Sequence, residues 1–313
     1  MGHLPLVSVL MSVYNSERYI AQAVESILNQ TYNDFEFVII DDGSTDRTPQ
    51  MLDAYAARDP RIRLIHRENR GIPKTRNQLL ALAQGELIAV MDSDDVALPD
   101  RLAAQVAFLQ AHPAVVWVGG AFELIDHKNR YLTCIGMPTT NAEIQQLLIE
   151  GHTSFLHPGA MIRKSAIQLV GGYDETLSTA HDLDLWLKLS EVGELANLAQ
   201  PVVQYRIHPD SICDRNQDKV LHEVQTAFDR AWERRGITHR FQATKVCGWR
   251  PTGDPGSRHE FMLKYGWWGF NSRHRDTARH YGLRAIATNP LDPEGWKLLA
   301  CAIAKPLPPS PSP

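Results

Sequence analysis

Strand-like and helix-like patterns alternate through the first ninety residues of this 313-residue chain. Short apolar runs, the pattern of buried strands, occupy residues 7–13, 35–40, 62–66 and 87–91. Segments with helical spacing separate them at about 20–28, 46–57 and 74–84. Parallel strands need such crossovers, which are right-handed in nearly all proteins. The alternation therefore predicts an α/β fold with a mostly parallel sheet and helices on both of its faces.

The strand predicted at 87–91 ends in three carboxylates within four residues, Asp92, Asp94 and Asp95. Polar residues also follow the other three strands, at Tyr14-Asn15, Asp41-Asp42 and 66–69. The carboxyl ends of parallel strands share one edge, where open α/β sheets bind ligands. Neighbouring carboxylates repel one another unless a cation neutralises them. The pattern favours a metal site for a phosphate-bearing ligand, and an acidic turn before the helix that starts near Pro99 is the structural alternative.

The second half of the chain is less regular. We expect a hairpin of strands at 115–124 and 131–135, a strand at 156–162 and a final strand at 202–207 that ends at His208. A helix over 182–189 buries one apolar stripe, and Asp182 at its start is either a cap or a reagent. Beyond residue 214 the predicted helices cover about 217–235, 258–270, 273–288 and 294–304.

Charge divides the chain into an acidic front and a basic back. Residues 214–313 hold 16 Lys and Arg against 10 Asp and Glu, although the whole chain carries a net charge of −4. Trp267-Trp268 and the nearby basic residues suggest either contact with an anionic membrane surface or a helical cap with a solvated basic face. The patch lies on no recognisable nucleic-acid module, so we expect no nucleic-acid partner.

Four well-separated cysteines suggest neither a disulfide framework nor a zinc motif, and fit a reducing cytoplasm. The N-terminal residues show no cationic stretch that leads into an apolar core and cleavage site, so we expect no secretory signal, and no apolar run reaches the roughly 18 residues that suggest a membrane span. We therefore expect a cytoplasmic protein, with peripheral contact at the inner face of the membrane as the open alternative.

Four stretches of the chain resemble the family 2 glycosyltransferases with the GT-A fold. They are Val9–Asn15, Val38–Asp46, Ala89–Asp95 with Pro99–Leu102, and Val170–Asp174 with Asp182–Trp186, and their order and spacing match over about 5–210. The resemblance implies a Rossmann-like GT-A catalytic domain over 1–213. The residue pattern predicts a helical region over 214–305 after it, and the proline and serine content predicts a disordered tail over 306–313. The resemblance also implies metal-dependent, inverting sugar transfer from a nucleotide-sugar donor, a UDP-sugar first, to a glycan or lipid-linked acceptor in cell-surface polysaccharide biosynthesis.

The same resemblance implies roles for particular residues. The residues implied for binding the nucleotide-sugar are Ser12, Tyr14, Asn15, Asp42, Arg76, Asp92 and Ser93. Asp92 and Asp94 would hold Mn²⁺ or Mg²⁺, and His208 as a further ligand would favour manganese. Asp182 corresponds to the catalytic base that takes the proton of the acceptor hydroxyl.

One position departs from the family pattern, because His181 stands where a glutamate usually precedes the base. We expect a protonated His181 to lower the pKa of Asp182. His157 is interpreted as a structural residue.

Two other functions compete with this interpretation. A phospho-acceptor receiver domain also gathers acids at strand ends, but it is much shorter and would leave Asp182 and His208 without a role. A catalytically silent, nucleotide-binding relative of the glycosyltransferases is the main alternative. A sugar-1-phosphate nucleotidyltransferase would begin with a Gly-rich loop and basic residues after the first strand, and Tyr14–Glu17 provide neither.

Overall fold

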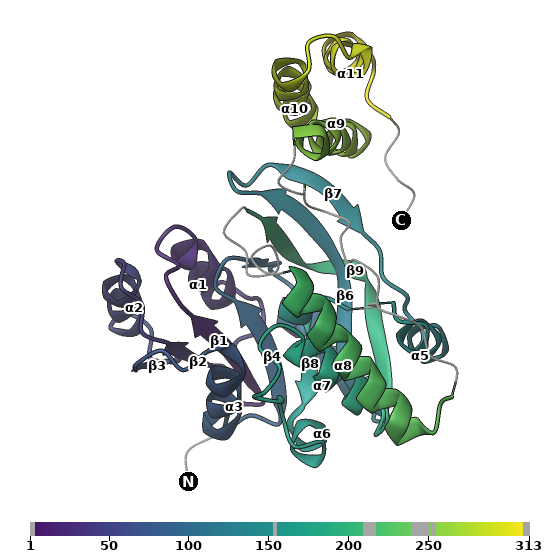
Figure 1. The fold of residues 1–313 in the computed structure, drawn as a ribbon. Helices are drawn as coiled ribbons and strands as arrows, with labels where there is room; N and C mark the ends of the chain where they lie inside the picture. The colour runs from purple at the N-terminus through teal and green to yellow at the C-terminus, as the bar shows by residue number, and fades with distance from the viewer. Residues whose placement is uncertain (1–3, 153–154, 209–216, 239–250, 252–254, 309–313) are drawn as a thin grey trace. The chain divides into compact units, whose positions relative to one another are not determined.

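The computed structural model describes residues 4–152, 155–208, 217–238, 251 and 255–308, shown in Figure 1. The chain forms two compact units. The first comprises Met1–Phe122, Gly136–Gln204 and Ile212–Lys245, and the second comprises Glu123–Ile135, Tyr205–Ser211 and Val246–Pro313. The predicted boundary at residue 213, between a catalytic domain and a C-terminal helical region, stays a prediction.

The first unit contains a four-stranded parallel region. Its strands, in spatial order, are β3 (Ile62–His66), β2 (Phe35–Asp41), β1 (Val7–Val13) and β4 (Leu87–Asp92). The crossovers between them contain α1 (Ile20–Leu28), α2 (Thr48–Ala56) and α3 (Ile72–Leu82). Ser12 lies opposite Ile40 on one side and Asp92 on the other, so the carboxyl ends of these strands are level. The predicted polar edge of the sheet is confirmed.

Beyond β4 the sheet becomes mixed. β8 (Met161–Arg163) pairs antiparallel with β4 and with β6 (Val115–Asp126). β9 (Glu194–Ile207) follows β6 in the sheet, and β5 (Val96–Ala97) pairs antiparallel with β9. β7 (Tyr131–Ile135) pairs with β6, so the predicted hairpin is confirmed.

The strand predicted over 156–162 is wrong in its first half. A single 3-10 turn, His157–Gly159, occupies that half, and the strand begins only at Met161. Pro158 lies in the first turn of this short helix, where its fixed φ suits helical geometry and its missing N–H costs nothing.

Alternating side chains of the strands build a core on each face of the sheet. On one face Val9 and Met11 pack with α1 and with α4 (Arg101–Ala111). On the other face Leu10 and Val90 pack with α3, α5 (Asn141–Ile149) and α6 (Lys164–Leu169). Two further helices belong to the same core, α7 (His181–Leu189), which is teal in Figure 1, and α8 (Gln217–Arg235), which is green. The predicted α/β class with helices on both faces is confirmed.

The described residues of the second unit form three helices, α9 (Pro255–Asn271), α10 (Arg275–Thr288) and α11 (Pro293–Ala304). They share a small core that includes Phe270 and Leu298. Gly266 allows close packing there, because a Cβ at this position would lie 2.3 Å from Leu298. Among the described residues, no helix has both the length and the apolar character needed to cross a bilayer.

Candidate active site

Three carboxylates gather where β4 ends. Asp92, Asp94 and Asp95 each place an oxygen within 4.8 Å of the others, and Asp95 is buried. Three closely spaced carboxylate oxygens fit a hard divalent cation, which also relieves the repulsion among them. The structure therefore brings the two predicted ligands, Asp92 and Asp94, together and adds Asp95 to the cluster.

Asp95 also faces a buried arginine. Arg101, at the start of α4, donates from Nη2 to the carbonyl oxygens of Val90 (2.7 Å) and Ala160 (3.0 Å). Burial lowers the pKa of Arg101 to about 10, while the charges of Asp95 and Asp92 oppose this shift. Arg101 thus supports the strand that carries the cluster, which gives a physical role to the arginine of the Pro99–Leu102 stretch.

Arg76 connects the acidic cluster to α7. Its Nη2 donates to Asp92 Oδ1 at 2.8 Å, and its Nη1 donates to His181 Nε2 at 2.7 Å. The guanidinium also lies over the ring of Tyr173, with Cζ 5.7 Å from the ring centre. Burial alone would lower the pKa of Arg76, but the carboxylates around it, Asp92 first, raise that pKa instead. The site therefore contains a permanently charged, buried cation.

Asp182 lies in the same electrostatic environment. Burial raises the pKa of its carboxyl group, the positive charge of Arg76 lowers it, and the negative charge of Asp92 raises it again. Its Oδ1 accepts a hydrogen bond from the Leu183 N–H at 2.8 Å. A carboxylate with a raised pKa is a better proton acceptor than an ordinary aspartate. The structure thus places the predicted base close to the predicted metal ligand Asp92.

The expectation of a protonated His181 is wrong. Burial and the charge of Arg76 lower the pKa of His181 to about 3, so the imidazole is neutral at pH 7. Because an arginine can only donate, His181 Nε2 accepts the hydrogen bond from Arg76. The cation that lowers the pKa of Asp182 is therefore Arg76 and not His181.

Replacing His181 with glutamine should flatten the acid side of the stability profile. The unfolded chain binds a proton at His181 near pH 6.5, whereas the folded chain does so only near pH 3, so falling pH favours unfolding. This group alone should cost about 2 kcal/mol between pH 6.5 and 5. Urea unfolding at both pH values checks this, with the exposed His112→Gln as the control. Equal slopes for His181→Gln and wild type would contradict the burial argument.

Asp42 is buried and holds the loop that follows β3. Its Oδ1 accepts from Arg67 Nε (2.8 Å) and from the Arg70 N–H (3.0 Å), and its Oδ2 accepts from the Gly71 N–H (2.9 Å). These bonds fix the residues that lead into α3, which carries Arg76. The contact of Asp42 with a nucleoside stays a prediction.

The other predicted nucleotide residues form the rim of the same sheet edge. Asn15 has a φ of 49°, its N–H donates to Ser44 Oγ, and its Oδ1 accepts from the Thr45 N–H. Ser93 Oγ lies 2.6 Å from Ser16 Oγ. Tyr14 is exposed, and Ser12 lies beside Asp92 in the sheet. Their contacts with a nucleotide stay predictions.

Two predicted histidines have different outcomes. His157 is buried between Trp186 Nε1, which donates to its Nδ1 at 3.2 Å, and the Tyr173 hydroxyl at 3.0 Å from its Nε2. Its structural interpretation is confirmed. His208 is buried just after β9 and belongs to the second unit, so its role as a metal ligand stays a prediction.

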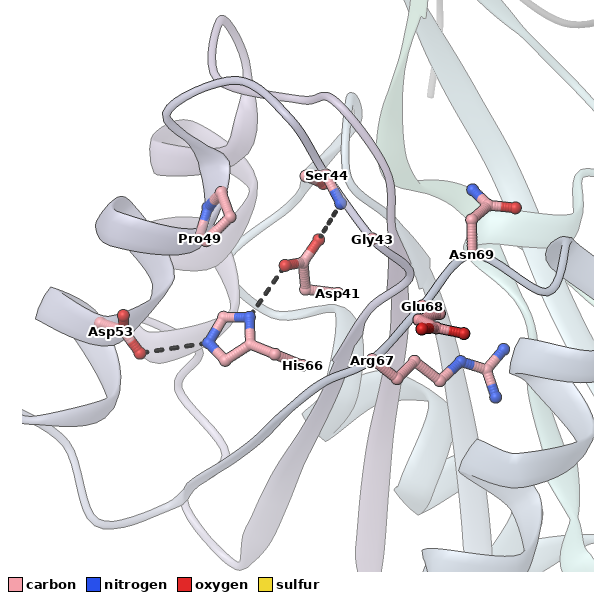
Figure 2. Close-up of a pocket in the computed structure, with 9 residues that line it drawn as sticks. All are labelled: Asp41, Gly43, Ser44, Pro49, Asp53, His66, Arg67, Glu68 and Asn69. Atoms are coloured by element: carbon pink, nitrogen blue, oxygen red, sulfur yellow. Dashed lines mark hydrogen bonds and ion pairs between the residues drawn. The ribbon is translucent and has the colours of Figure 1, made fainter.

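A cavity of about 620 Å³ opens beside this edge, between the ends of β2 and β3 and the start of α2 (Figure 2). Within it, His66 bridges Asp41 Oδ2 (2.8 Å) and Asp53 Oδ1 (3.1 Å). Burial alone would lower the pKa of His66, but the hydrogen bonds to Asp41 and Asp53 outweigh it and raise that pKa. Arg67 lines the cavity and also binds Asp42, so the cavity adjoins the predicted nucleoside site. No recognisable motif surrounds Asp53, so the sequence does not indicate its place in this cavity.

Comparison with solved structures first defines the class of fold. Staphylococcus aureus TarS 1–349 in complex with UDP-GlcNAc superposes with a TM-score of 0.61 over 96% of this chain and 87% of that one, at 20% identity. A mannosyltransferase from Pyrobaculum calidifontis, PcManGT, in complex with GDP-Man and Mn²⁺, gives a TM-score of 0.56 over 96% and 80%, also at 20% identity. The fold is that of GT-A glycosyltransferases.

Sequence comparison identifies the family. The family model described as Glycosyl transferase family 2 matches residues 8–171. A putative glycosyltransferase of Bacillus subtilis (strain 168), EpsE, is 36% identical over 219 residues, which cover 67% of this chain and 76% of the relative. Chondroitin synthase of Escherichia coli is 33% identical over 73% of this chain, but the match covers only 31% of that protein. The chain belongs to glycosyl transferase family 2 and is a glycosyltransferase.

Proposed function

We propose that this glycosyltransferase is metal-dependent and inverts the anomeric configuration of the sugar that it transfers. The donor is a nucleotide-sugar, a UDP-sugar first, and the acceptor is a hydroxyl of a glycan or of a lipid-linked saccharide. The observation that carries the proposal is the Arg76 bridge, which links the predicted metal ligand Asp92 to the helix that begins with His181-Asp182. Donor-side and acceptor-side groups thus share one network.

The relatives support the choice of substrates. Solved structures with this fold include complexes with UDP-GlcNAc, with UDP, and with GDP-Man and Mn²⁺. Curated relatives include chondroitin synthase and hyaluronan synthase, each matched over less than a third of its length. They support a role in polysaccharide biosynthesis at the cell surface. Free Cys134 and Cys301 are consistent with a cytoplasmic location, where a lipid-linked acceptor would be reached at the inner face of the membrane.

In the proposed reaction, Asp92, Asp94 and Asp95 would hold Mn²⁺ or Mg²⁺. The bound cation would neutralise the charge that develops on the leaving diphosphate. Asp42, Ser12, Tyr14, Asn15 and Ser93 bind the nucleotide end of the donor. Arg76 keeps Asp92 in place and adds positive charge near the diphosphate. Asp182 accepts the proton of the acceptor hydroxyl as that oxygen attacks the anomeric carbon, and this single displacement inverts the centre.

Metal removal tests the first part of this proposal. We expect the enzyme with Mn²⁺ to release nucleoside diphosphate from at least one of UDP-GlcNAc, UDP-glucose and GDP-mannose. Excess EDTA should lower the rate more than tenfold, because the three aspartates then repel the diphosphate, and added Mn²⁺ should restore it. Equal rates in EDTA and in Mn²⁺ would refute metal dependence. Binding of UDP with Mn²⁺ but no turnover of any donor would favour the catalytically silent alternative.

A further inference from the structure

The N-cap residue of the helix that carries Asp182 provides no side-chain cap. Ala180 is the N-cap residue of α7, and its side chain has no oxygen that could accept from the first turn. The first N–H groups of a helix have no partner within the helix, so they need one from elsewhere. Here the backbone N–H groups just before the first turn of α7 donate to a side chain of another helix. The N–H groups of Thr179 and Ala180 donate to Glu223 Oε2 on α8, at 2.6 and 3.2 Å.

Glu223 binds this segment with both of its oxygens. Oε1 accepts from Ser178 Oγ at 3.0 Å, and Oε2 also accepts from Thr179 Oγ1 at 2.7 Å. The side chain is nearly inaccessible, with Glu223 only 6% exposed. Burial alone would raise its pKa, but these hydrogen bonds lower it, so the group is an anion at neutral pH. Negative charge at a helix N-terminus is also stabilised by the helix dipole.

The helix that provides Glu223 is itself rigidly held. Phe228 and Trp232, five and nine positions after Glu223 on α8, are buried in the same core as Leu183 and Trp186 of α7. Asp182 follows the capped residue Ala180 by only two positions. The direction in which the Asp182 carboxylate points therefore depends on a segment whose backbone and hydroxyl groups are fixed by Glu223.

We propose that Glu223 is a positioning residue that sets the orientation of Asp182 for the transfer reaction. This inference rests on the proposed function, in which Asp182 is the base. Glu223 would act through the backbone of residues 178–180, without touching donor or acceptor. It lies outside the segment matched by the family model, which ends at residue 171. The first helix beyond residue 213 would then form part of the catalytic apparatus.

Two substitutions at Glu223 and one control test the proposal. Glu223→Gln keeps the shape and one good acceptor, whereas Glu223→Ala removes the cap. Misplacing a reacting group by about 1 Å can cost about 100-fold in rate. We expect kcat for the hydrolysed donor to fall about 10-fold for Gln and about 100-fold for Ala. The KM for donor and the affinity for UDP with Mn²⁺ should stay within about twofold. Glu233→Gln, an exposed glutamate on the same helix, should behave like wild type.

Hydrogen exchange shows whether the cap itself is lost. In Glu223→Ala, amides of residues 179–184 should exchange faster, while those of β1 and β4 keep their protection. An unchanged exchange rate at 179–184 overturns the proposal. This test does not need activity, so it also holds if the wild-type enzyme hydrolyses none of the three donors. A uniform loss of protection together with weaker UDP binding overturns it too, because Glu223 would then support only the fold.

Asp182→Asn, assayed in parallel, separates the two hypotheses. If Asp182→Asn is inactive while Glu223→Ala keeps the wild-type kcat, the positioning role fails and the proposed base remains. If Asp182→Asn is fully active, the proposed base itself fails, and the positioning role fails with it.

Discussion

Asp182→Asn should lower kcat for sugar transfer by about 10²- to 10⁴-fold, the usual contribution of a general base. Asparagine has nearly the same shape, and its Oδ1 can keep the hydrogen bond from the Leu183 N–H. It cannot accept the proton of the acceptor hydroxyl. Affinity for UDP with Mn²⁺ and the melting temperature should therefore stay close to wild type.

The pH dependence of kcat gives an independent check. The base works only when it is deprotonated, and burial raises the pKa of Asp182. As the pH is lowered, wild-type kcat should therefore begin to fall at a higher pH than it would with a base of ordinary aspartate pKa. This acid limb should be absent from the residual activity of Asp182→Asn. Asp276→Asn, which removes a fully exposed carboxylate, is the matched control. A kcat within twofold of wild type for Asp182→Asn would exclude Asp182 as the base.

Arg76→Met should cost both stability and activity. It leaves Asp92 Oδ1 and His181 Nε2 without the donor that each now has, and it removes the cation next to Asp182. Hydrogen bonds to charged groups are worth about 1.5–3 kcal/mol, and part of Asp92 stays in contact with water. We expect the free energy of unfolding to fall by about 2 kcal/mol and kcat to fall about 100-fold.

Urea unfolding and donor hydrolysis measure these effects. Arg76→Lys should recover only part of the loss, because an ammonium group cannot reproduce the forked contact with Asp92 and His181. Arg47→Met is the control, since Arg47 pairs with Glu17 on the surface with 82% of its side chain exposed. Such pairs contribute about 0–1 kcal/mol. An Arg76→Met protein as stable and active as the control would contradict the role of the bridge.

The parallel half of the fold could be predicted because its signals are local. The apolar runs from Val7 and Leu87 and the helical segments between them indicate where strands form, and parallel pairing places their carboxyl ends at one edge. Which strands are neighbours could not be predicted in this way, and only the structure shows that Asp92 lies beside Ser12. The antiparallel half has weaker local signals, and the residues of the turn at His157–Gly159 have the sequence pattern of a strand.

Partnerships between distant residues could not be predicted in this way. Arg76 and His181 are 105 positions apart, and Glu223 lies more than forty positions after the segment that it caps. The helical pattern of α8 predicted a helix but did not show which glutamate would be buried. The pKa of His181 depended on the same missing information, because burial and Arg76, rather than the ordinary pKa of histidine, determine its charge.

The attachment of α8 to the first unit has a consequence for how such enzymes exchange parts during evolution. Phe228 and Trp232 complete a core that also contains Val38 and Val90 of the parallel strands. A recombination breakpoint near residue 213 would separate these aromatic rings from that core and leave α7 without the carboxylate that holds its start. Viable chimaeras with a different C-terminal region should therefore join beyond Ile237, so that the inherited catalytic module keeps this helix.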